Sequence, residues 1–414
     1  MGDTPYPLRT VTDDELDHFF RMISRAFGED VRPEEIALDR LTAEAGRTLA
    51  AFDGDEMVGT AGAFTFDLAV PGGRLPAAGV TYVGVSPTHR RRGVLTSMMQ
   101  RQLADIHERG EPVAVLWASE AAIYGRYGYG LASRRMDVEI DRTQTAVRRD
   151  LPVDESVEVR LVAPADMQDA VEAIERAVVD ERPGQFVRDA RWVETALADL
   201  ESRRHGRSAM QGVLATRGGR PAGYATYSTK ASAVRGHAIA DGDIAVIAQR
   251  ALDPAADLAV TRLLLSLDLM RRVRWWNQPL DSAIPHVLTD PRQARSIITD
   301  GLHARVVDVP AALSGRRYAR PVDVAVAVTD DRCPWNAGTW RLVADGDGVA
   351  DCERTDAAAD VALDVEALGA AYLGGTPLTA LAAAGRVSTT NPLRLNDLSV
   401  AFGWSRLPWC PVIF

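Results

Sequence analysis

The stretch VGVSPTHRRRGVLTSMM, residues 83–99, constrains the fold more than any other part of the chain. An apolar, β-rich run ends near a proline, three arginines follow, and Gly93 precedes a segment of helical character. A strand that leads through a glycine-containing loop into a helix directs several backbone N–H groups at one point, and such points bind anions. We therefore expect an α/β unit with a diphosphate-binding turn. The alternative is an exposed basic loop that pairs with surface acids.

Length, charge and cysteine content narrow the class of protein. At 414 residues the chain exceeds what one core usually supports, so we expect two to three domains. The formal net charge of −10 argues against a nucleic-acid partner and suits a cationic substrate. Cys333, Cys352 and Cys410 form an odd set without zinc-type spacing, which predicts a reducing, cytoplasmic location and no metal.

The sequence predicts no targeting or anchoring segment. Its start, MGDTPYPLRTVTDDELDHFF, lacks an apolar signal core, and no later stretch offers about 18 consecutive apolar residues. Tyr6 stands where the myristoylation pattern needs Ser or Thr. We therefore expect a soluble protein without a membrane partner.

The first part of the chain predicts alternating helices and strands. Thr12 and Glu15 form a capping-box pattern ahead of Leu16, Phe19 and Phe20, which recur at helical spacing. The expected elements are helices at 12–28 and 33–44, a hairpin of strands 48–52 and 57–64, a strand at 79–85, a helix at 93–109, a strand at 112–118 and a short helix at 121–127.

A weaker copy of this order follows. A hairpin is expected from strands 213–216 and 222–227, then a strand at 243–248 and a helix at 258–271. The junction between these last two elements, QRALDPAAD, carries acids and alanines where the first copy has its arginines. We interpret the two halves as structurally related, the first active and the second a scaffold.

The last third of the chain has a different texture. Strands are expected at 324–328 and 340–343, and helices at 365–372 and 377–384, the second with Thr376 as N-cap and Pro377 in its first position. With linkers placed near residues 150 and 300, the predicted domains are 1–150, 151–300 and 301–414.

The run VGVSPTHRRRGVL resembles motif A of the GNAT superfamily of N-acetyltransferases, which wraps the diphosphate of acetyl-CoA. Leu95 replaces the small residue that usually ends the motif, and this variant resembles the pattern of the enhanced intracellular survival (Eis) family. A second stretch, ASEAAIYGRYGYG at 118–130, resembles another signature of that family, and LVAP, PHVLTD and LGG extend the resemblance along the chain. The resemblance implies mixed α/β sheets in tandem GNAT domains, a C-terminal domain similar to sterol carrier proteins, and a homohexamer.

The resemblance also assigns a binding site for acetyl-CoA. Strand residues would bind the pantetheine arm through their backbone, and the arginine-glycine turn would bind the diphosphate. His89, inside the motif, is interpreted as structural because its position faces the phosphate end. The expected cofactor-binding residues are Val83, Gly84, Val85, Arg90, Arg91, Arg92, Gly93, Val94, Leu95, Thr96, Ser119 and Glu120.

Acetyl transfer to an amine needs a base for the ammonium and an acid for the leaving thiolate. The tyrosine that donates this proton in the family corresponds to Tyr124, while Tyr127 and Tyr129 are interpreted as packing residues. The family's base is the carboxylate of its last residue, which here is Phe414. Glu29 corresponds to an acidic substrate contact; the alternative is a solvated acid.

The tail WSRLPWCPVIF supports a buried end physically, because it is apolar and its two prolines lower the entropy lost on docking. The alternative is that it only closes a hydrophobic seam. The family pattern has an acid before the terminal phenylalanine, whereas this chain has Ile413.

Together with these residues, the resemblance implies an acetyl-CoA-dependent N-acetyltransferase that acts on primary amines of aminoglycoside-like polycations, at several positions. We expect direct transfer without an acyl-enzyme, since no cysteine lies near either motif. The alternatives are a protein-lysine or polyamine N-acetyltransferase, or a non-catalytic acyl-CoA or lipid-binding protein.

Overall fold

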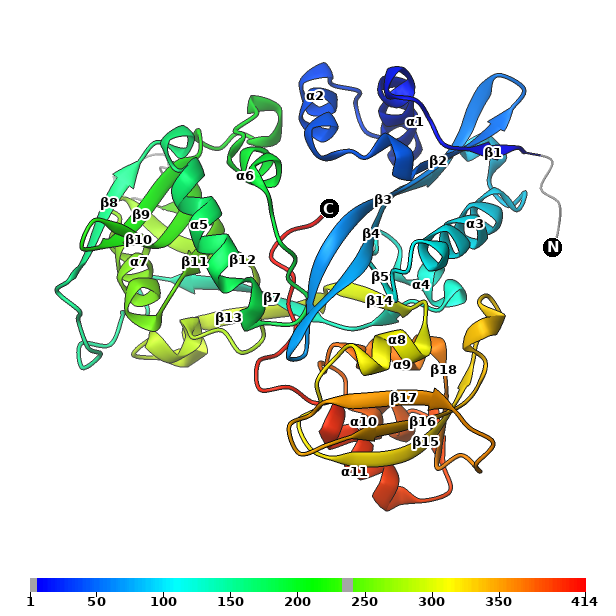
Figure 1. Cartoon of the computed structure of the whole chain (residues 1–414). Helices are drawn as coiled ribbons and strands as arrows, with labels where there is room; N and C mark the ends of the chain where they lie inside the picture. The colour runs from blue at the N-terminus through cyan, green and yellow to red at the C-terminus, as the bar shows by residue number, and fades with distance from the viewer. Residues whose placement is uncertain (1–5, 233–240) are drawn as a thin grey trace. The chain divides into compact units, whose positions relative to one another are not determined.

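The structure is a computed structural model that describes residues 6–232 and 241–414. The expectation for the start of the chain rests partly on residues 1–5, which lie outside this range. The chain divides into two compact units (Figure 1). Unit 1 combines the chain up to Ser133 with Arg182–Phe186 and Asp300–Phe414, and unit 2 combines Arg134–Glu181 with Val187–Thr299.

Unit 1 contains a seven-stranded mixed sheet in the order β1-β2-β3-β4-β5-β14-β6. The only parallel pair in this order joins β4 and β5; the other neighbours are antiparallel within the described residues. The strands are β1 (Leu8–Arg9), β2 (Thr48–Asp53), β3 (Glu56–Val70), β4 (Gly73–Val85), β5 (Val113–Trp117), β14 (Leu302–Val306) and β6 (Gly130–Leu131).

The helices of the first domain are α1 (Leu16–Phe27), α2 (Pro33–Thr42), α3 (Val94–Glu108) and α4 (Ala121–Tyr124). Phe19, Phe20 and Ile23 of α1 are buried at the expected helical spacing. Gly28 ends this helix in the left-handed conformation, with φ of 74°. The predicted helices, hairpin and strands of this region are confirmed, although the first turn of the predicted helix 12–28 is a 3₁₀ turn, Asp13–Glu15.

The parallel pairing of β4 and β5 stops before either strand ends. The register runs from Ala77 opposite Val113 to Val80 opposite Leu116. Beyond this point β4 continues to Val85 and stays paired with β3 on its other side. The edge of β4 at 83–85 that faces away from β3 therefore keeps backbone groups free for another partner.

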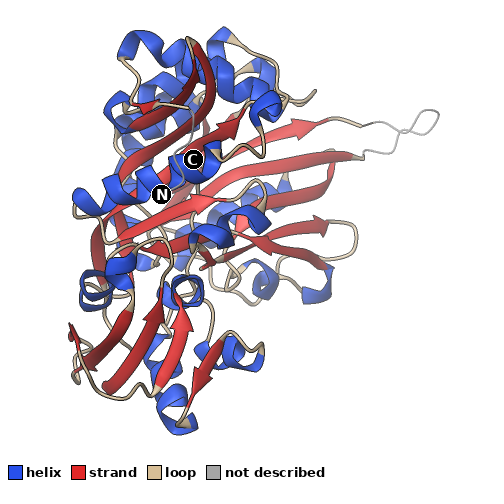
Figure 2. Ribbon diagram, turned by 90° about the vertical axis from the view of Figure 1, so that its right-hand side faces the viewer, coloured by secondary structure: helices blue, strands red, loops and turns tan. Residues whose placement is uncertain are grey.

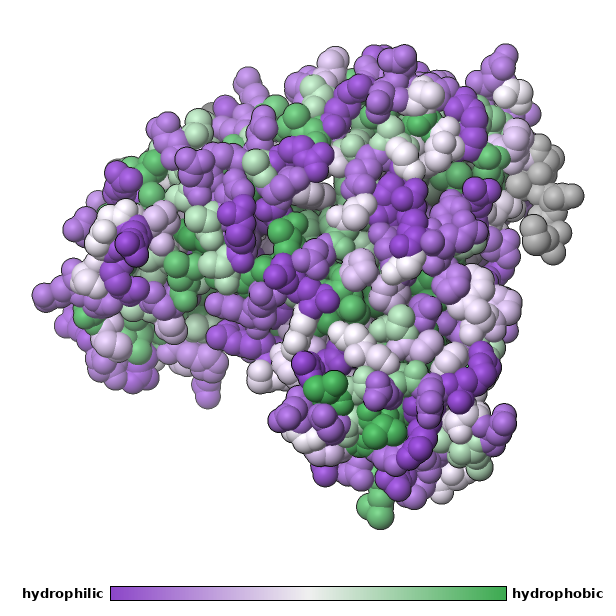
Figure 3. Space-filling model, in the orientation of Figure 1, coloured by the Kyte–Doolittle hydropathy of each residue, from purple (hydrophilic) through white to green (hydrophobic). Residues whose placement is uncertain are grey.

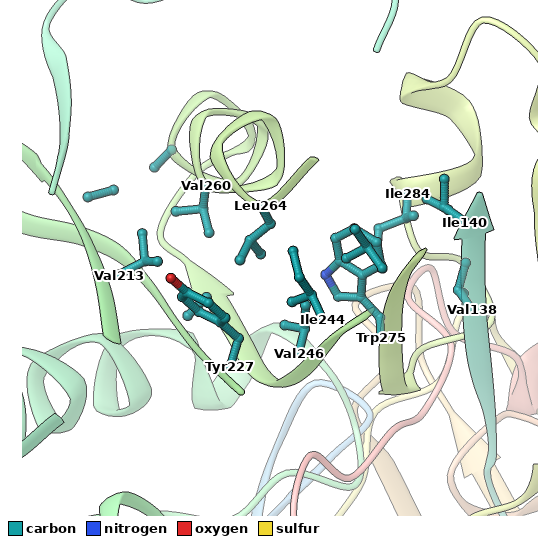
Figure 4. Packing of buried hydrophobic residues seen from close by; sticks show 14 of the residues in the cluster. Val138, Ile140, Val213, Tyr227, Ile244, Val246, Val260, Leu264, Trp275 and Ile284 are labelled. Carbon is teal, nitrogen blue, oxygen red and sulfur yellow. The ribbon is translucent and has the colours of Figure 1, made fainter. Parts of the chain in front are cut away.

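Unit 2 contains a second seven-stranded sheet in the order β13-β7-β12-β11-β10-β9-β8. Its strands are β7 (Arg134–Asp141), β8 (Val157–Val162), β9 (Gln211–Arg217), β10 (Arg220–Lys230), β11 (Gly242–Ala251), β12 (Met270–Gln278) and β13 (Ala294–Asp300). Its helices are α5 (Gln168–Val178), α6 (Ala190–Leu197) and α7 (Pro254–Ser266). In Figure 4, Val260 and Leu264 of α7 lie with Ile244, Val246 and Trp275 of the sheet in one apolar core.

The helix predicted at 258–271 was placed too late. It begins at Pro254, because the Asp253 carboxylate accepts hydrogen bonds from the backbone N–H groups of Ala255 and Ala256. It ends at Ser266, since Met270 already starts β12, a strand missing from the prediction. The strands predicted in this half are confirmed.

The order of strands along the sequence does not match their division between the two sheets. β7 precedes residue 150 yet belongs to the second sheet, and β14 follows residue 300 yet lies between β5 and β6 in the first. Each of these strands belongs to the sheet of the neighbouring domain, so the sheets do not define domain limits along the sequence. The limits expected near residues 150 and 300 therefore remain predictions.

The C-terminal part of unit 1 holds a five-stranded sheet in the order β17-β16-β15-β18-β19. Its strands are β15 (Val322–Thr329), β16 (Gly338–Ala344), β17 (Ala350–Arg354), β18 (Val361–Asp364) and β19 (Val387–Thr389). The helices are α8 (Val309–Ser314), α9 (Val365–Tyr372), α10 (Leu378–Ala383) and α11 (Pro392–Phe402). Helices lie beside the strands of each sheet in Figure 2.

The strands predicted at 324–328 and 340–343 and the helix at 365–372 are confirmed. The N-cap expected at Thr376 is wrong: α10 has Pro377 at its N-cap, and the Thr376 hydroxyl donates to the Leu131 carbonyl oxygen at 3.3 Å. Helix α11 was missed, although Asn391 followed by Pro392 is an N-cap signal.

Across the described residues, no helix combines the length and the apolar character needed to cross a membrane. The face drawn in Figure 3 is mostly hydrophilic, with scattered hydrophobic residues.

Candidate active site

The arginine-glycine turn leads into α3 through a strained backbone. Arg91 has φ of 62° and Gly93 has φ of 84°, so both lie in the left-handed region. Gly93 is the N-cap and brings no side chain to the first turn. The first hydrogen bond of the helix runs from the Ser97 N–H to the Gly93 carbonyl, so the N–H groups of residues 94–96 have no helical acceptor. This turn therefore offers donors and the positive end of a helix dipole to an anion.

A cavity of about 640 Å³ opens at this turn, and we call it the first cavity. It brings together all the predicted cofactor-binding residues except Arg92, whose guanidinium donates to the Tyr6 hydroxyl at 3.1 Å. The other lining residues, which the sequence analysis did not assign to cofactor binding, are Ala26, Phe27, His89, Ile123, Tyr124, Arg126 and Tyr127.

The charge of the first cavity is mainly positive. Arg90, Arg91 and Arg126 line it, against the single carboxylate of Glu120. Arg90 is oriented by a hydrogen bond from its Nη2 to the Ala26 carbonyl oxygen at 3.2 Å. Arg126 belongs to the IYGRYG stretch, and its position two residues after Tyr124 in that motif could have identified it as a lining residue of the cavity. Guanidinium groups beside free N–H donors are suited to a diphosphate.

His89 is buried and held from both ring nitrogens. Its Nε2 lies 3.1 Å from Asp53 Oδ2, and its Nδ1 lies 2.8 Å from the Thr88 hydroxyl. Its ring also meets Tyr6 edge to face. With both nitrogens engaged, His89 supports the turn and is unsuited to act as a free base.

A smaller cavity of about 250 Å³, the second cavity, adjoins the first. The two share Phe27, Val83, Ser119 and Tyr124 as lining residues. The second cavity also brings together the predicted residues Glu29 and Phe414. Its remaining lining residues, which sequence analysis missed, are Ile23, Ser24, Asp39, Val80, Thr81, Tyr82 and Trp117.

Tyr124 lies at the end of α4, where the two cavities meet. Its side chain is only 6% exposed, and burial raises the pKa of its phenol to about 12, with smaller contributions from Glu120 and Tyr127. A phenol with this pKa keeps its proton at neutral pH, so Tyr124 can act as a proton donor.

The neighbouring tyrosines have other surroundings. The Tyr127 hydroxyl lies 3.2 Å from that of Thr96, and its ring lines only the first cavity. Tyr129 lines neither cavity; its hydroxyl is buried and has no hydrogen-bond partner among the described residues. Tyr124 is thus the tyrosine common to both cavities.

The end of the chain is anchored rather than free. The Phe414 ring meets Phe66 edge to face at 4.9 Å between ring centroids, and Phe64 and Phe186 complete this aromatic cluster. The indole Nε1 of Trp117 donates to the Val412 carbonyl oxygen at 2.8 Å. The tail therefore reaches the second cavity through long-range contacts that no local pattern predicts.

Two acids line the second cavity. Glu29 is exposed, directly after the end of α1. Asp39 comes from α2 and lies close enough to Tyr82 that its charge adds to burial in raising the pKa of that phenol. Helical spacing could have indicated Asp39 as a polar residue beside the buried Ile36, but nothing local connects it to the site. Ile413 is exposed, and it does not line either cavity.

The corresponding junction in unit 2 is filled by its own side chains. Asp253 caps α7, as described above, and also pairs with Arg217, with Nη1 and Oδ2 2.6 Å apart. The carboxylate therefore occupies the anion position that Gly93 leaves open in unit 1. This difference supports the interpretation of unit 2 as a scaffold.

Within residues 6–232 and 241–414, no group of three or more His, Cys, Asp or Glu side chains is arranged to hold a metal ion. The three cysteines are buried and form no disulfide with the described residues, and none of them lines either cavity.

Comparisons with protein families agree with this architecture. An acetyltransferase (GNAT) domain family matches residues 7–132, and another acetyltransferase (GNAT) domain family matches residues 184–306. A sterol carrier protein domain family matches residues 309–411. The predicted fold, two GNAT domains and a sterol-carrier-like domain, is confirmed.

Similar proteins cover almost the whole chain. An uncharacterized N-acetyltransferase of Streptomyces avermitilis is 44% identical over 98% of this chain and 98% of its own. The N-acetyltransferase Eis of Mycobacterium bovis is 35% identical over 94% of this chain and 95% of its own. The crystal structure of Eis1 from Mycobacterium abscessus, at 32% identity, covers 99% of this chain and 100% of that chain with a TM-score of 0.84. The chain therefore belongs to the Eis family of GNAT N-acetyltransferases, whose co-substrate is acetyl-CoA.

Proposed function

We propose that this acetyltransferase moves the acetyl group of acetyl-CoA to primary amines of aminoglycoside-like polycations, at several positions of one molecule. The observation that carries the proposal is the place of Tyr124 between two cavities of opposite character. The first is lined by arginines and free N–H donors, and the second by acids and Phe414.

In this proposal the first cavity binds acetyl-CoA. Arg90, Arg91 and the first-turn N–H groups of α3 bind the diphosphate, since donors of this kind favour anions. At the free edge of β4, the backbone N–H groups of residues 83–85 donate hydrogen bonds to the pantetheine amides, and the backbone carbonyls accept hydrogen bonds from them. Together they direct the thioester toward Tyr124.

The second cavity then positions the amine. The carboxylates of Glu29 and Asp39 attract ammonium groups, and several ammonium groups on one molecule allow several binding orientations. The α-carboxylate of Phe414 accepts the proton of the reacting ammonium, directly or through water. A neutral amine is required because an alkyl ammonium, with a pKa of about 10, has no lone pair for attack.

Tyr124 completes the proton balance. The amine nitrogen forms the C–N bond and the C–S bond breaks, while the Tyr124 phenol donates its proton to the departing sulfur. The new amide nitrogen loses a proton, which restores the phenol, and the Phe414 carboxyl releases the ammonium proton to water, which restores the base. Transfer is direct, because no cysteine among the described residues lines the site.

A thiol-release assay tests this proposal. We would measure coenzyme A release with an aminoglycoside, a linear polyamine and a lysine-containing peptide as acceptors. The proposal predicts highest turnover with the aminoglycoside and more than one acetyl group per molecule by mass spectrometry. Higher turnover with the polyamine would contradict the proposal and indicate a polyamine N-acetyltransferase. Higher turnover with the peptide would contradict it and indicate a protein-lysine N-acetyltransferase.

Tyr124→Phe and Tyr129→Phe form a matched pair for the same assay. Loss of the Tyr124 phenol should lower kcat by roughly 10²-fold or more and leave the KM for acetyl-CoA nearly unchanged. The Tyr129 hydroxyl has no hydrogen-bond partner among the residues that the structure describes, so its removal should not lower kcat. Full activity of Tyr124→Phe would exclude Tyr124 as the proton donor.

We also propose that the chain assembles as a homohexamer, as the family resemblance implies. Light scattering of the purified chain should give six times the mass of one chain; the mass of one or two chains would contradict it.

A further inference from the structure

Unit 2 holds a cavity of about 480 Å³ that has no part in the acetyl-transfer site. We call it the arginine cavity, because four arginines line it: Arg142, Arg148, Arg149 and Arg262. Its other lining residues are Thr145, Ala146, Val147, Leu265, Ser266 and Leu288. All of them come from the segment after β7, from α7 and from the segment before β13.

The wall that carries Arg148 and Arg149 is held in place by backbone hydrogen bonds. The Arg148 N–H donates to the Val287 carbonyl at 2.9 Å, and the Thr289 N–H donates to the Ala146 carbonyl at 2.8 Å. Between these bonds Val147 pairs with Leu288 as an isolated antiparallel bridge. The cavity is therefore a defined structural feature rather than the inside of a loose loop.

Two of the arginines are half-buried and oriented by carbonyl groups. Arg142 Nη1 donates to the Met270 carbonyl at 2.7 Å and also to that of Leu267. Arg262 donates from Nη1 and Nη2 to the carbonyls of residues 152 and 151, at 3.2 and 3.1 Å. Because a guanidinium carries five N–H donors, each group keeps donors for a further acceptor.

The positive charge in the cavity is not balanced by acids in its lining. No Asp or Glu is among the described residues that line it, although the whole chain has a net charge of −10. Arg148 pairs with Asp150 at 2.6 Å, outside the lining, whereas Arg149 has no hydrogen bond or ion pair with the described residues. Like charges gathered this closely repel one another unless an anion joins them.

The cavity also has an apolar part. Leu288 is fully buried, and Val147 and Leu265 are half-buried in the same lining. An inorganic anion would leave these side chains without a partner, whereas an anion with an aliphatic part covers them.

We propose that the arginine cavity is a second ligand site, which binds a small organic anion consisting of a phosphate or carboxylate head and a short apolar group. Arg149 and Arg148 bind the head, Arg142 and Arg262 supply charge from fixed positions, and the apolar side chains contact the tail. Binding is non-covalent and independent of acetyl transfer.

Calorimetric titration with n-hexyl phosphate, hexanoate, inorganic phosphate and hexanol tests this proposal. The expected result is saturable binding of one or both hexyl anions, at least roughly tenfold tighter than inorganic phosphate, and no binding of hexanol. The difference between hexyl phosphate and hexanoate identifies the preferred head group. Equal affinity for inorganic and hexyl phosphate would overturn the assignment of the apolar part.

The variants Arg149→Glu and Arg160→Glu locate the binding. Arg160 is an exposed arginine of β8 in the same unit and does not line the cavity, so its variant makes the same charge change elsewhere. Arg149→Glu should weaken binding at least roughly tenfold, while Arg160→Glu should match the unaltered chain.

The variant Arg91→Glu distinguishes binding in the first cavity from binding in the arginine cavity, because Arg91 lines the first cavity and not the arginine cavity. Binding that Arg91→Glu abolishes and Arg149→Glu retains would overturn the proposal, as would equal losses in Arg149→Glu and Arg160→Glu. Acetyl transfer is measured in parallel and should be unchanged in Arg149→Glu, so failure of the proposed function would not affect this test.

Discussion

At the scale of single residues, two glycines of the same helix have similar backbone conformations but different surroundings. Gly93 and Gly110 lie at opposite ends of α3 with φ of 84° and 71°, and an added Cβ would meet no atom of the described residues within 4 Å at either position. Only Gly93 borders the first cavity. Substituting each glycine in turn therefore distinguishes the effect of backbone strain, which both variants share, from an effect on ligand binding, which only the Gly93 variant can have.

Gly93→Ala is expected to raise the KM for acetyl-CoA by roughly tenfold, because strain tilts the first-turn N–H groups and the methyl group narrows the approach of the diphosphate. Gly110→Ala carries the same left-handed strain, about 1 kcal/mol, and should leave that KM unchanged. Steady-state kinetics with thermal unfolding of both variants checks this. Equal KM values in the two variants would show that the turn does not contact the co-substrate.

The raised pKa of Tyr124 predicts the shape of the pH profile. In the proposed mechanism the protonated phenol is the active form, so activity that depends on it is present below its pKa and is lost only as the pH rises through about 12. An ordinary tyrosine, with a pKa near 10, would produce a falling limb about two pH units lower. The pH dependence of kcat up to pH 10.5 should show no loss assignable to a phenol, and a limb near pH 10 that Tyr124→Phe removes would contradict it.

At the scale of elements, the ends of β4 and β5 position residues that line the two cavities. The pairing of β4 and β5 ends at Val80, so Val83–Val85 and Trp117 diverge around the site. Trp117, the last residue of β5, holds the tail through the carbonyl of Val412. A matching bond occurs elsewhere in unit 1, where Trp335 Nε1 donates to the Val307 carbonyl, also at 2.8 Å.

Trp117→Phe should lower kcat several-fold and speed the removal of C-terminal residues by carboxypeptidase, since the tail loses its anchor. The KM for acetyl-CoA should stay close to that of the unaltered chain, because Trp117 does not line the first cavity. Trp335→Phe removes the equivalent bond away from the tail and serves as the control. If carboxypeptidase digests both variants at the same rate, the Trp117 bond does not anchor the end.

At the scale of the whole molecule, one buried ion pair connects the segment beside Tyr124 to the C-terminal part of unit 1. Arg305 of β14 and Asp330, just after β15, are both 0% exposed and lie 2.7 Å apart. Arg305 Nε also donates to the Tyr127 carbonyl at 2.9 Å, directly beside the Tyr124 segment. The same arginine therefore supports two parts of the chain that are far apart in sequence.

Asp330→Ala should destabilise unit 1 by about 3–5 kcal/mol, because it leaves the Arg305 charge buried without a counter-ion. The exposed pair of Arg341 and Asp323 is the control, and Asp323→Ala should cost at most about 1 kcal/mol. Urea titrations of both variants, followed by fluorescence and by residual activity, measure the difference. Similar midpoints would show that the buried pair contributes no more than a surface pair.

Local sequence patterns predicted much of this molecule. The arginine-glycine turn, helix α3, helix α9 and the short helix that ends at Tyr124 all depend on neighbouring residues, and the structure contains each of them. Asp39, Trp117 and Tyr82 were missed at the site because each is an ordinary helix or strand residue in its own segment. Only the folded chain brings them to one cavity.

The sequence by itself determined most of the helices and strands and the open glycine-containing turn before α3, because capping, hydrophobic period and backbone freedom act over a few residues. The family followed from the resemblance of two short motifs to a known family. The tertiary structure alone decided that β14 joins the first sheet, that Asp39 and Trp117 line the second cavity beside Phe414, and that four arginines meet in unit 2. Contacts of this kind join residues that lie far apart in the chain, and their free energy depends on burial and packing that no short segment specifies.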